Sequence, residues 1–336
     1  SAKDIAGDGA AAAAGDSVTG WADLSGNNYD AYVHQGAPEF DADGMNANGG
    51  VNFDGSRSMT MADTTAINGT DFTQKSFAFS FETGNSVSGH QVIYEQGGSS
   101  RGYSLSIAED GGVAKLFAFI YNRIEWPSGE LHQAIDLGPV QPNTAYSAAM
   151  VHDSTDGSGT FTGFLNGQQV GQLTGVPMQR SHNGDVGIGD VKDSSVHPVT
   201  ESTTSSGSGA FQGSIGEIVS WNNALDVGDI AQITQHMTNE WGTDGGVIDL
   251  TGYTLVPTNP LDVLELTGVV DAPFTTTLMV NDLEVLPEQT GALTQQSAPA
   301  YAGGELTVSG ALSITDADTG EAGFQAGTVS GSHGSL

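Results

Sequence analysis

The sequence predicts an all-β protein: an antiparallel β-sandwich that ends in one helix, followed by a smaller β module. Two observations carry this fold class. Residues 76–81 and residues 116–121 alternate aromatic with other side chains, which is the period of a strand with one buried face. Glycine-rich breaks separate such runs, and Asn166-Gly167 is a strong hairpin signal.

The strand pattern begins at Trp21, after about 20 residues rich in Ala, Gly and Asp that carry little structural signal. Short alternating runs then continue to Trp221. Residues 200–210 are mostly Ser, Thr and Gly, so we expect a long loop there, before a strand that starts at Phe211.

One helix is expected after these strands. Asp226 suits its N-cap, and Asp229 in the first turn favours the positive end of the helix dipole. Gly242 suits the position after the last turn. Four apolar residues recur between them at helical spacing: Ile230, Ile233, Met237 and Trp241.

The sequence pattern changes after Gly245. Four prolines punctuate strand-like runs up to residue 287, and residues 304–320 alternate cleanly. We therefore expect two domains, with a sandwich in residues 1–247 and an immunoglobulin-like β module in residues 248–336. We expect this module to be incomplete at its C-terminus.

The charge of the chain is strongly one-sided. Forty Asp and Glu residues stand against eight Lys and Arg residues, a net charge of −32, while 37% of residues are hydrophobic. A folded surface must therefore carry many carboxylates that repel one another. Calcium prefers such oxygen ligands, so the composition favours bound Ca²⁺. The alternative is an acidic surface that serves solubility alone.

Several classes of protein are excluded by the composition. The chain has no cysteine, which excludes disulfides, thiolate metal sites and cysteine catalysis. The scarcity of Lys and Arg argues against binding nucleic acid or anionic membranes. No apolar run approaches the roughly 18 residues of a membrane span, so no membrane insertion is expected. Because the chain opens at Ser1 without a signal peptide, we expect a fragment of a longer exported protein.

Five passages share their order and spacing with a known family. They are WADLSGNN (21–28), VNFDGS (51–56), QVIYEQGG with RGYSL (91–105), the hairpin at 146–167, and FQGSIGEI through WNNAL (211–225). Together they resemble the bacterial laminin-G-like, concanavalin A-like jelly rolls, over residues 17–242. The family usually has Asp where Gly216 stands. The resemblance implies a concanavalin A-like jelly-roll sandwich and a lectin-like ligand site.

A second resemblance lies in residues 305–336. The stretch ITDADTGEA (314–322) is similar to repeat modules of large, repeat-containing (RTX-type) bacterial surface adhesins. Those proteins are exported, are stiffened by Ca²⁺ and often carry lectin modules. The resemblance implies an extracellular, cell-surface location, neighbouring repeat modules as partners, and attachment to glycans on host cells or in biofilm.

A candidate ligand site is expected where three loops meet at one end of the sandwich. Sugars are bound by flat aromatic rings together with amide, carboxylate and guanidinium groups. Trp126 is the tryptophan that the sequence places in a loop. The alternative is that Arg101 and Arg123 only neutralise Glu95 and Glu125. The candidate residues are Glu95, Gln96, Arg101, Tyr121, Asn122, Arg123, Trp126 and Asp156.

Candidate calcium ligands lie in two places. Asp190 and Asp193 are three residues apart in a passage similar to one in pentraxins, and two such carboxylates can converge on one cation. Asn85 lies in a loop at the same end of the sandwich. Asp316, Asp318 and Glu321 form a second acidic series, of the kind that binds Ca²⁺ at junctions between repeats. The alternative in both places is solvated loop carboxylates.

The sequence favours a binding protein over an enzyme. A retaining glycosidase needs two carboxylates about 5 Å apart, and Glu217 has no acidic partner two residues away on its strand. No G-x-S-x-G nucleophile motif stands at a strand-to-helix turn. We therefore expect a calcium-dependent lectin module of an adhesin without catalytic residues. The alternatives are a polysaccharide-active glucanase or lyase, a peptide-binding module and a structural spacer.

Overall fold

The computed structural model describes residue 5, residues 12–125 and residues 128–243, together with the backbone of six short strands after residue 288. Side chains are described for the same residues except residue 47, residues 123–131 and those six strands. The chain divides into two compact units, Ser1–Gly246 and Val247–Leu336.

The described strands of the second unit form three antiparallel pairs. β18 (Gln289–Thr294) pairs with β21 (Ala311–Asp316), β19 (Ala300–Ala302) with β20 (Glu305–Thr307), and β22 (Ser330–Gly331) with β23 (Gly334–Ser335). The predicted immunoglobulin-like fold and its completeness depend on connections that lie outside the described residues.

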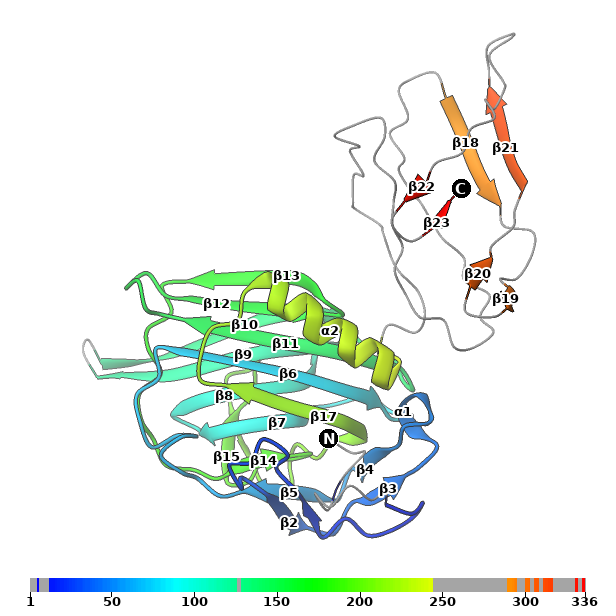
Figure 1. Ribbon diagram of the computed structural model, residues 1–336. Coiled ribbons are helices and arrows are strands. Elements are labelled where there is room, and N and C mark those ends of the chain that lie inside the picture. The colour runs from blue at the N-terminus through cyan, green and yellow to red at the C-terminus, as the bar shows by residue number, and fades with distance from the viewer. Residues whose placement is uncertain are drawn as a thin grey trace. The chain divides into compact units, whose positions relative to one another are not determined.

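The first unit consists of two antiparallel sheets packed face to face (Figure 1). The eight-stranded sheet contains, in spatial order, β1 (Gly20–Trp21), β2 (Ala31–Gln35), β5 (Ser58–Met61), β14 (Val186–Ile188), β7 (Gln91–Gly98), β8 (Arg101–Asp110), β9 (Val113–Glu125) and β10 (Ser128–Pro139). The seven-stranded sheet contains β13 (Gln168–Thr174), β12 (Thr160–Leu165), β11 (Ala145–Asp153), β6 (Gln74–Thr83), β17 (Gln212–Trp221), β4 (Gly50–Asp54) and β3 (Glu39–Asp41). This arrangement confirms the predicted jelly-roll sandwich.

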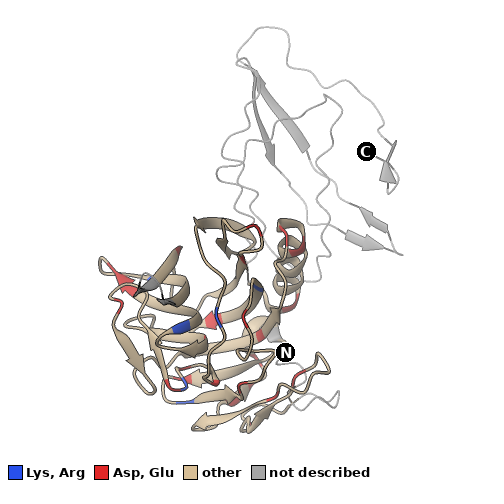
Figure 2. Ribbon diagram, turned by 90° about the vertical axis from the view of Figure 1, so that its left-hand side faces the viewer, with Lys and Arg blue, Asp and Glu red and all other residues tan. Residues whose placement is uncertain are grey.

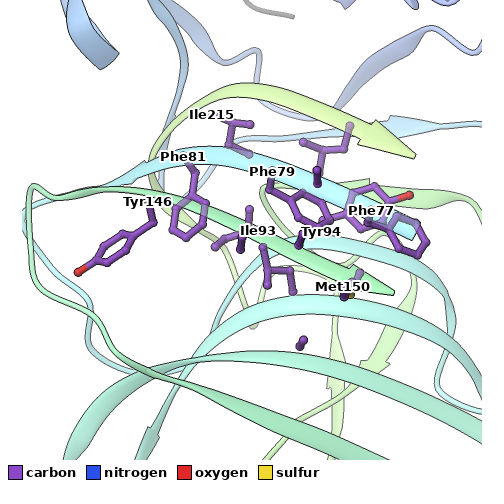
Figure 3. Packing of buried hydrophobic residues seen from close by; sticks show 14 of the residues in the cluster. Phe77, Phe79, Phe81, Ile93, Tyr94, Tyr146, Met150 and Ile215 are labelled. Carbon is purple, nitrogen blue, oxygen red and sulfur yellow. The ribbon is translucent and has the colours of Figure 1, made fainter. Parts of the chain in front are cut away.

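Aromatic side chains fill the space between the sheets (Figure 3). Phe77, Phe79 and Phe81 alternate along β6 and are fully buried. The rings of Phe77 and Phe79 lie 5.6 and 5.3 Å from that of Tyr94 on the opposite sheet, at tilted angles that aromatic pairs prefer. Burying each phenylalanine contributes about 2–3 kcal/mol, so these strands bind the two layers together.

The predicted helix is α2 (Val227–Trp241), which lies across the seven-stranded sheet (Figure 1). Asp226 accepts a 2.8 Å hydrogen bond from the backbone N–H of Asp229, whose side chain accepts from Asp226 in return. Gly242 ends the helix in the left-handed conformation. Both predicted ends are therefore confirmed. The short α1 (Gly44–Ala47) contributes one turn, and neither helix in the described part of the chain is long and apolar enough to cross a membrane.

The surroundings of Gly216 leave no room for a side chain. A β-carbon there would lie 2.6 Å from the indole ring of Trp241, which is 1% exposed. An aspartate at this position would push the helix off the sheet. The indole nitrogen instead donates a 3.2 Å hydrogen bond to Glu217, one residue further along β17.

Candidate functional site

The outward face of the eight-stranded sheet carries one row of cross-strand neighbours that spans all its strands. Tyr94 on β7 and Leu105 on β8 point into the core, so the residues that alternate with them point outward. The exposed Tyr32 lies near one end of the row, and the carboxyl of Glu95 lies near its centre. The row runs through Gly20, Tyr32, Thr60, Gly187, Glu95, Ser104, Phe119 and Ala134.

Residues 190–210, here named the roof segment, cover the middle of this row. The segment contains β15 (Ser194–Val196) and β16 (Thr203–Ser205), which pair only with each other. Its two ends meet, because the N–H of Phe211 donates a 2.8 Å bond to the carbonyl of Gly189. A β-carbon on Gly187 would lie 2.3 Å from the carbonyl oxygen of Asp190, so the segment crosses the row directly above that glycine.

Asp190 closes the base of the roof segment. Its carboxylate is 1% exposed and accepts 2.7 Å bonds from the backbone N–H groups of Val191 and Gly207. Burial raises the pKa of this carboxyl, and the backbone N–H bonds oppose that shift. Asp190 is therefore a structural anchor between two distant parts of the segment.

Asp193 faces solvent, whereas Asp190 is buried. The carboxylate of Asp193 is 64% exposed and lies 3.3 Å from Nζ of Lys192, while both oxygens of Asp190 already accept bonds. Asn85 is exposed in its own loop. Among the described residues, no three His, Asp or Glu side chains gather as a cation would need. The calcium site at Asp190, Asp193 and Asn85 and the calcium dependence stay predictions.

Replacing Asp190 with alanine should lower the free energy of unfolding by about 2 kcal/mol, because two buried backbone N–H groups would lose their acceptor. Urea denaturation measures this change. The matched control is Asp193→Ala, which removes an exposed carboxylate and should change the stability by less than about 0.5 kcal/mol. Equal effects of the two substitutions would contradict the anchoring role.

Glu95 lies at the centre of the row, under the roof segment. It is fully buried, and its Oε1 accepts a 3.3 Å bond from the hydroxyl of Tyr121, which lies 3.4 Å from Oγ of Ser195 on β15. Its Oε2 accepts no well-formed hydrogen bond within the described part of the chain, and the backbone N–H of Lys192 in the roof segment lies close enough to the carboxyl to act against the rise of its pKa. Burial raises the pKa of Glu95 well above its ordinary value, which favours the neutral carboxylic acid.

An aromatic pair continues the site toward β10. The rings of Phe119 and Tyr121 lie 5.4 Å apart and, with Val196 of the roof segment, form a small apolar cluster separate from the main core. On β8, Ser104 and Ser106 are buried beside this pair, and neither hydroxyl has a partner among the described residues.

Tyr32 belongs to the same row but is not covered by the roof segment. Its side chain is 56% exposed. No other aromatic side chain in residues 12–122 and 132–243 is so exposed. Two residues along β2, His34 lies 3.1 Å from Oγ of Ser206, and burial together with the charge of Lys192 lowers its pKa. Tyr32, Thr60, His34, Lys192 and Asp193 are named the open strip.

The residues predicted for a loop rim are distributed over both faces of the sheet. Glu95 and Tyr121 meet on the outward face. Gln96 and Asn122 are the next residues on the same strands and therefore point inward, where they donate to the carbonyls of Ile67 (2.9 Å) and Met178 (2.7 Å).

Two of the other predicted residues, Arg101 and Asp156, have partners elsewhere. Arg101 donates a 3.1 Å bond to the carbonyl of Ser181, and Asp156 accepts bonds from Ser158 within its own exposed turn. The side chain of Arg123 and all of Trp126 lie outside the described residues. So do Asp318, Glu321 and the side chain of Asp316, whose backbone ends β21.

Sequence reasoning missed Tyr32, Ser104 and Ser195. A signal for Tyr32 was present in the run AYVHQ, where Ala31 is buried and Tyr32 is exposed. Alternation therefore marks the outward face of β2. No such signal exists for Ser195, because its place above Tyr121 depends on the path of the roof segment.

No family model matches the chain, and no curated protein matches it. Among solved structures it is similar to a heptameric SAP-like pentraxin from Limulus polyphemus, with 14% identity, 55% of this chain and 80% of that chain covered, and a TM-score of 0.39. Domain 4 of an extracellular arabinanase from Geobacillus stearothermophilus, solved with arabinotriose, has 14% identity, coverage of 66% and 100%, and a TM-score of 0.44.

The CBM40 domain of a Ruminococcus gnavus IT-sialidase is a third similar structure, with 14% identity, coverage of 48% and 83%, and a TM-score of 0.36. At such identities and scores, these likenesses carry no inference about a ligand.

Proposed function

We propose that the first unit is a carbohydrate-binding domain and that the open strip is where a glycan first binds. The exposed ring of Tyr32 is the observation that carries this proposal. It stands on the outward face of the sheet, where a sugar ring can stack on it. Lys192 and Asp193 supply a cation and a carboxylate for hydrogen bonds to sugar hydroxyls.

The charge of the protein favours a neutral glycan. Asp and Glu residues are distributed over many strands and loops, and Lys and Arg are few (Figure 2). The negative potential of this surface would repel a uronate or sialylated glycan, whereas it would not repel a neutral sugar. The same acidity favours the calcium dependence and the surface-adhesin setting that we propose for the domain, with neighbouring repeat modules as its partners.

Binding is favoured over catalysis by the surroundings of Glu95. Its carboxyl bonds to a tyrosine, while the oxygens of Asp190 are occupied by backbone N–H groups. A glycosidase of the retaining type needs a second free carboxyl about 5 Å away. A glucanase or lyase is therefore the second candidate.

Replacing Tyr32 with alanine should weaken glycan binding by about tenfold, because a stacking surface is lost. A glycan array of neutral and acidic oligosaccharides, probed with calcium and with chelator, identifies the ligand, and calorimetry compares the variants. Tyr32→Phe keeps the ring and should retain most of the affinity. Val170→Ala, which removes an exposed apolar side chain from β13, is the matched control.

Absence of glycan binding in either condition would overturn the proposed function. Release of shortened oligosaccharides from any member of the array would favour the enzyme alternative instead. Binding that chelator leaves unchanged would remove calcium from the proposal and leave the glycan.

A further inference from the structure

The roof segment is fastened firmly at its base and weakly along its length. At the base, backbone bonds of 2.7–3.0 Å join Gly189 to Ile93 and Phe211, and Gly209 to Val92. The hairpin β15–β16 has only three residue pairs and no pairing with the sheet below it. An isolated two-stranded hairpin of this size is marginally stable by itself.

The contacts that hold the hairpin down are mostly single polar pairs. Ser195 lies 3.4 Å from the Tyr121 hydroxyl, Thr204 lies 3.1 Å from His90, and Glu201 lies 3.4 Å from His132. Val196 supplies an apolar contact, against Phe119 and Tyr121. Such contacts are each worth about 1 kcal/mol, so lifting the hairpin costs far less than unfolding the sandwich.

The groups under the hairpin have the chemistry of a sugar site. The hydroxyls of Ser104 and Ser106 are buried without partners in the described structure, although such groups are normally bonded, and Oε2 of Glu95 has no well-formed hydrogen bond there. They lie beside the aromatic pair Phe119 and Tyr121, which offers a stacking surface.

We propose that the hairpin β15–β16 lifts off the sheet while the base of the roof segment stays in place, up to the neck where the N–H of Ser206 donates to the carbonyl of Asp193, and that Glu95, Tyr121 and Ser104 then bind a second residue of a neutral saccharide. This inference rests on the proposed function and extends the open strip along the same row of the sheet. Glu95, as a neutral acid, donates one hydrogen bond and accepts another. Asp190, Asp193 and Glu201 of the roof segment disfavour an anionic sugar there.

Opening of the roof segment can be measured without any ligand. Because the chain has no cysteine, Ser104→Cys carries a single thiol under the roof segment, and Ser106→Cys is a second probe on the same strand. Ser80→Cys is the matched control, because Ser80 is equally buried but lies against Gly216 beneath Trp241 of α2. In native buffer, a thiol reagent should modify the Ser104→Cys variant about 100-fold faster than the Ser80→Cys variant. Equal rates would overturn the inference.

The ligand is tested with the neutral oligosaccharide that binds best on the array. Glu95→Met removes the hydrogen-bonding groups at nearly constant size and should weaken binding about tenfold, whereas Glu95→Gln should bind within about threefold of the wild type. Melting curves confirm that both variants fold. If Tyr32→Ala weakens binding and Glu95→Met does not, the inference fails while the proposed function stands. If the wild type binds no glycan at all, the proposed function itself fails.

Discussion

Replacing Lys75 with methionine should raise the free energy of unfolding at pH 7 by about 3 kcal/mol, an unusual gain for removing a charge. Lys75 lies on β6 and is 2% exposed. Its Nζ lies 3.9 Å from the centre of the Phe72 ring and donates a 2.9 Å bond to the carbonyl of Ile67. No ion pair in the described part of the chain involves it. Gln96 also donates to that carbonyl, so the substitution leaves no orphaned acceptor.

The pH dependence gives the sharper test. Burial lowers the pKa of Lys75 from 10.5 to about 7. Between these values the unfolded chain holds a proton that the folded chain does not, so wild-type stability should rise by up to about 4 kcal/mol from pH 7 to pH 10. Lys75→Met should lack this rise, and Lys192→Met, at a partly exposed lysine, should keep it. Parallel curves for wild type and Lys75→Met in urea denaturation would show that Lys75 is charged in the fold.

Below neutral pH, the buried His152 should lower the free energy of unfolding by about 3 kcal/mol as the pH falls from 6.5 to 4. The side chain is fully buried and its Nδ1 lies 2.9 Å from the hydroxyl of Tyr103. Burial lowers its pKa from 6.5 to about 4. As the pH falls from 6.5 to 4, the unfolded chain binds a proton that the folded chain does not bind, so the free energy of unfolding falls.

The test compares His152→Gln, which can still bond to Tyr103, with His236→Gln at an exposed histidine on α2. Carboxylates also titrate in this range, so the difference between each variant and the wild type is the quantity to measure. His152→Gln should lose about 3 kcal/mol less than the wild type on acidification, and His236→Gln should follow the wild type. If the free energy of unfolding of His152→Gln fell with pH as steeply as that of the wild type, other groups would cause the acid sensitivity.

Much of the fold could be predicted because its signals are local. The three phenylalanines of β6 alternate in the sequence and are all buried in the core. The two ends of α2 follow from Asp226 and Gly242, whose effects reach only a few residues. The loop expected at residues 200–210 was only partly right, because Thr203–Ser205 pairs with Ser194–Val196. Ser and Thr at these positions give no sign of that pairing.

The candidate site was less predictable because its contacts are distant in sequence. Glu95 and Tyr121 were both singled out, and their contact follows from the order of β7, β8 and β9. Asp190 was expected to face a cation, but its partner Gly207 is 17 residues away, and no local pattern reveals such a bond. Gln96 and Asn122 alternate with Glu95 and Tyr121 on β7 and β9, so they point inward and do not lie at the predicted rim.

The meeting of the two ends of the roof segment has a consequence for how such a domain can diversify. Residues 190–210 leave and rejoin the sandwich at neighbouring points, since Gly189 and Phe211 are bonded to each other. A peptide of another length or composition can therefore replace them without stretching the framework, as in loops grafted onto antibody scaffolds. Exchanging the roof segment alone can thus alter the binding preference, while the strands that carry Tyr32 and Glu95 stay unchanged.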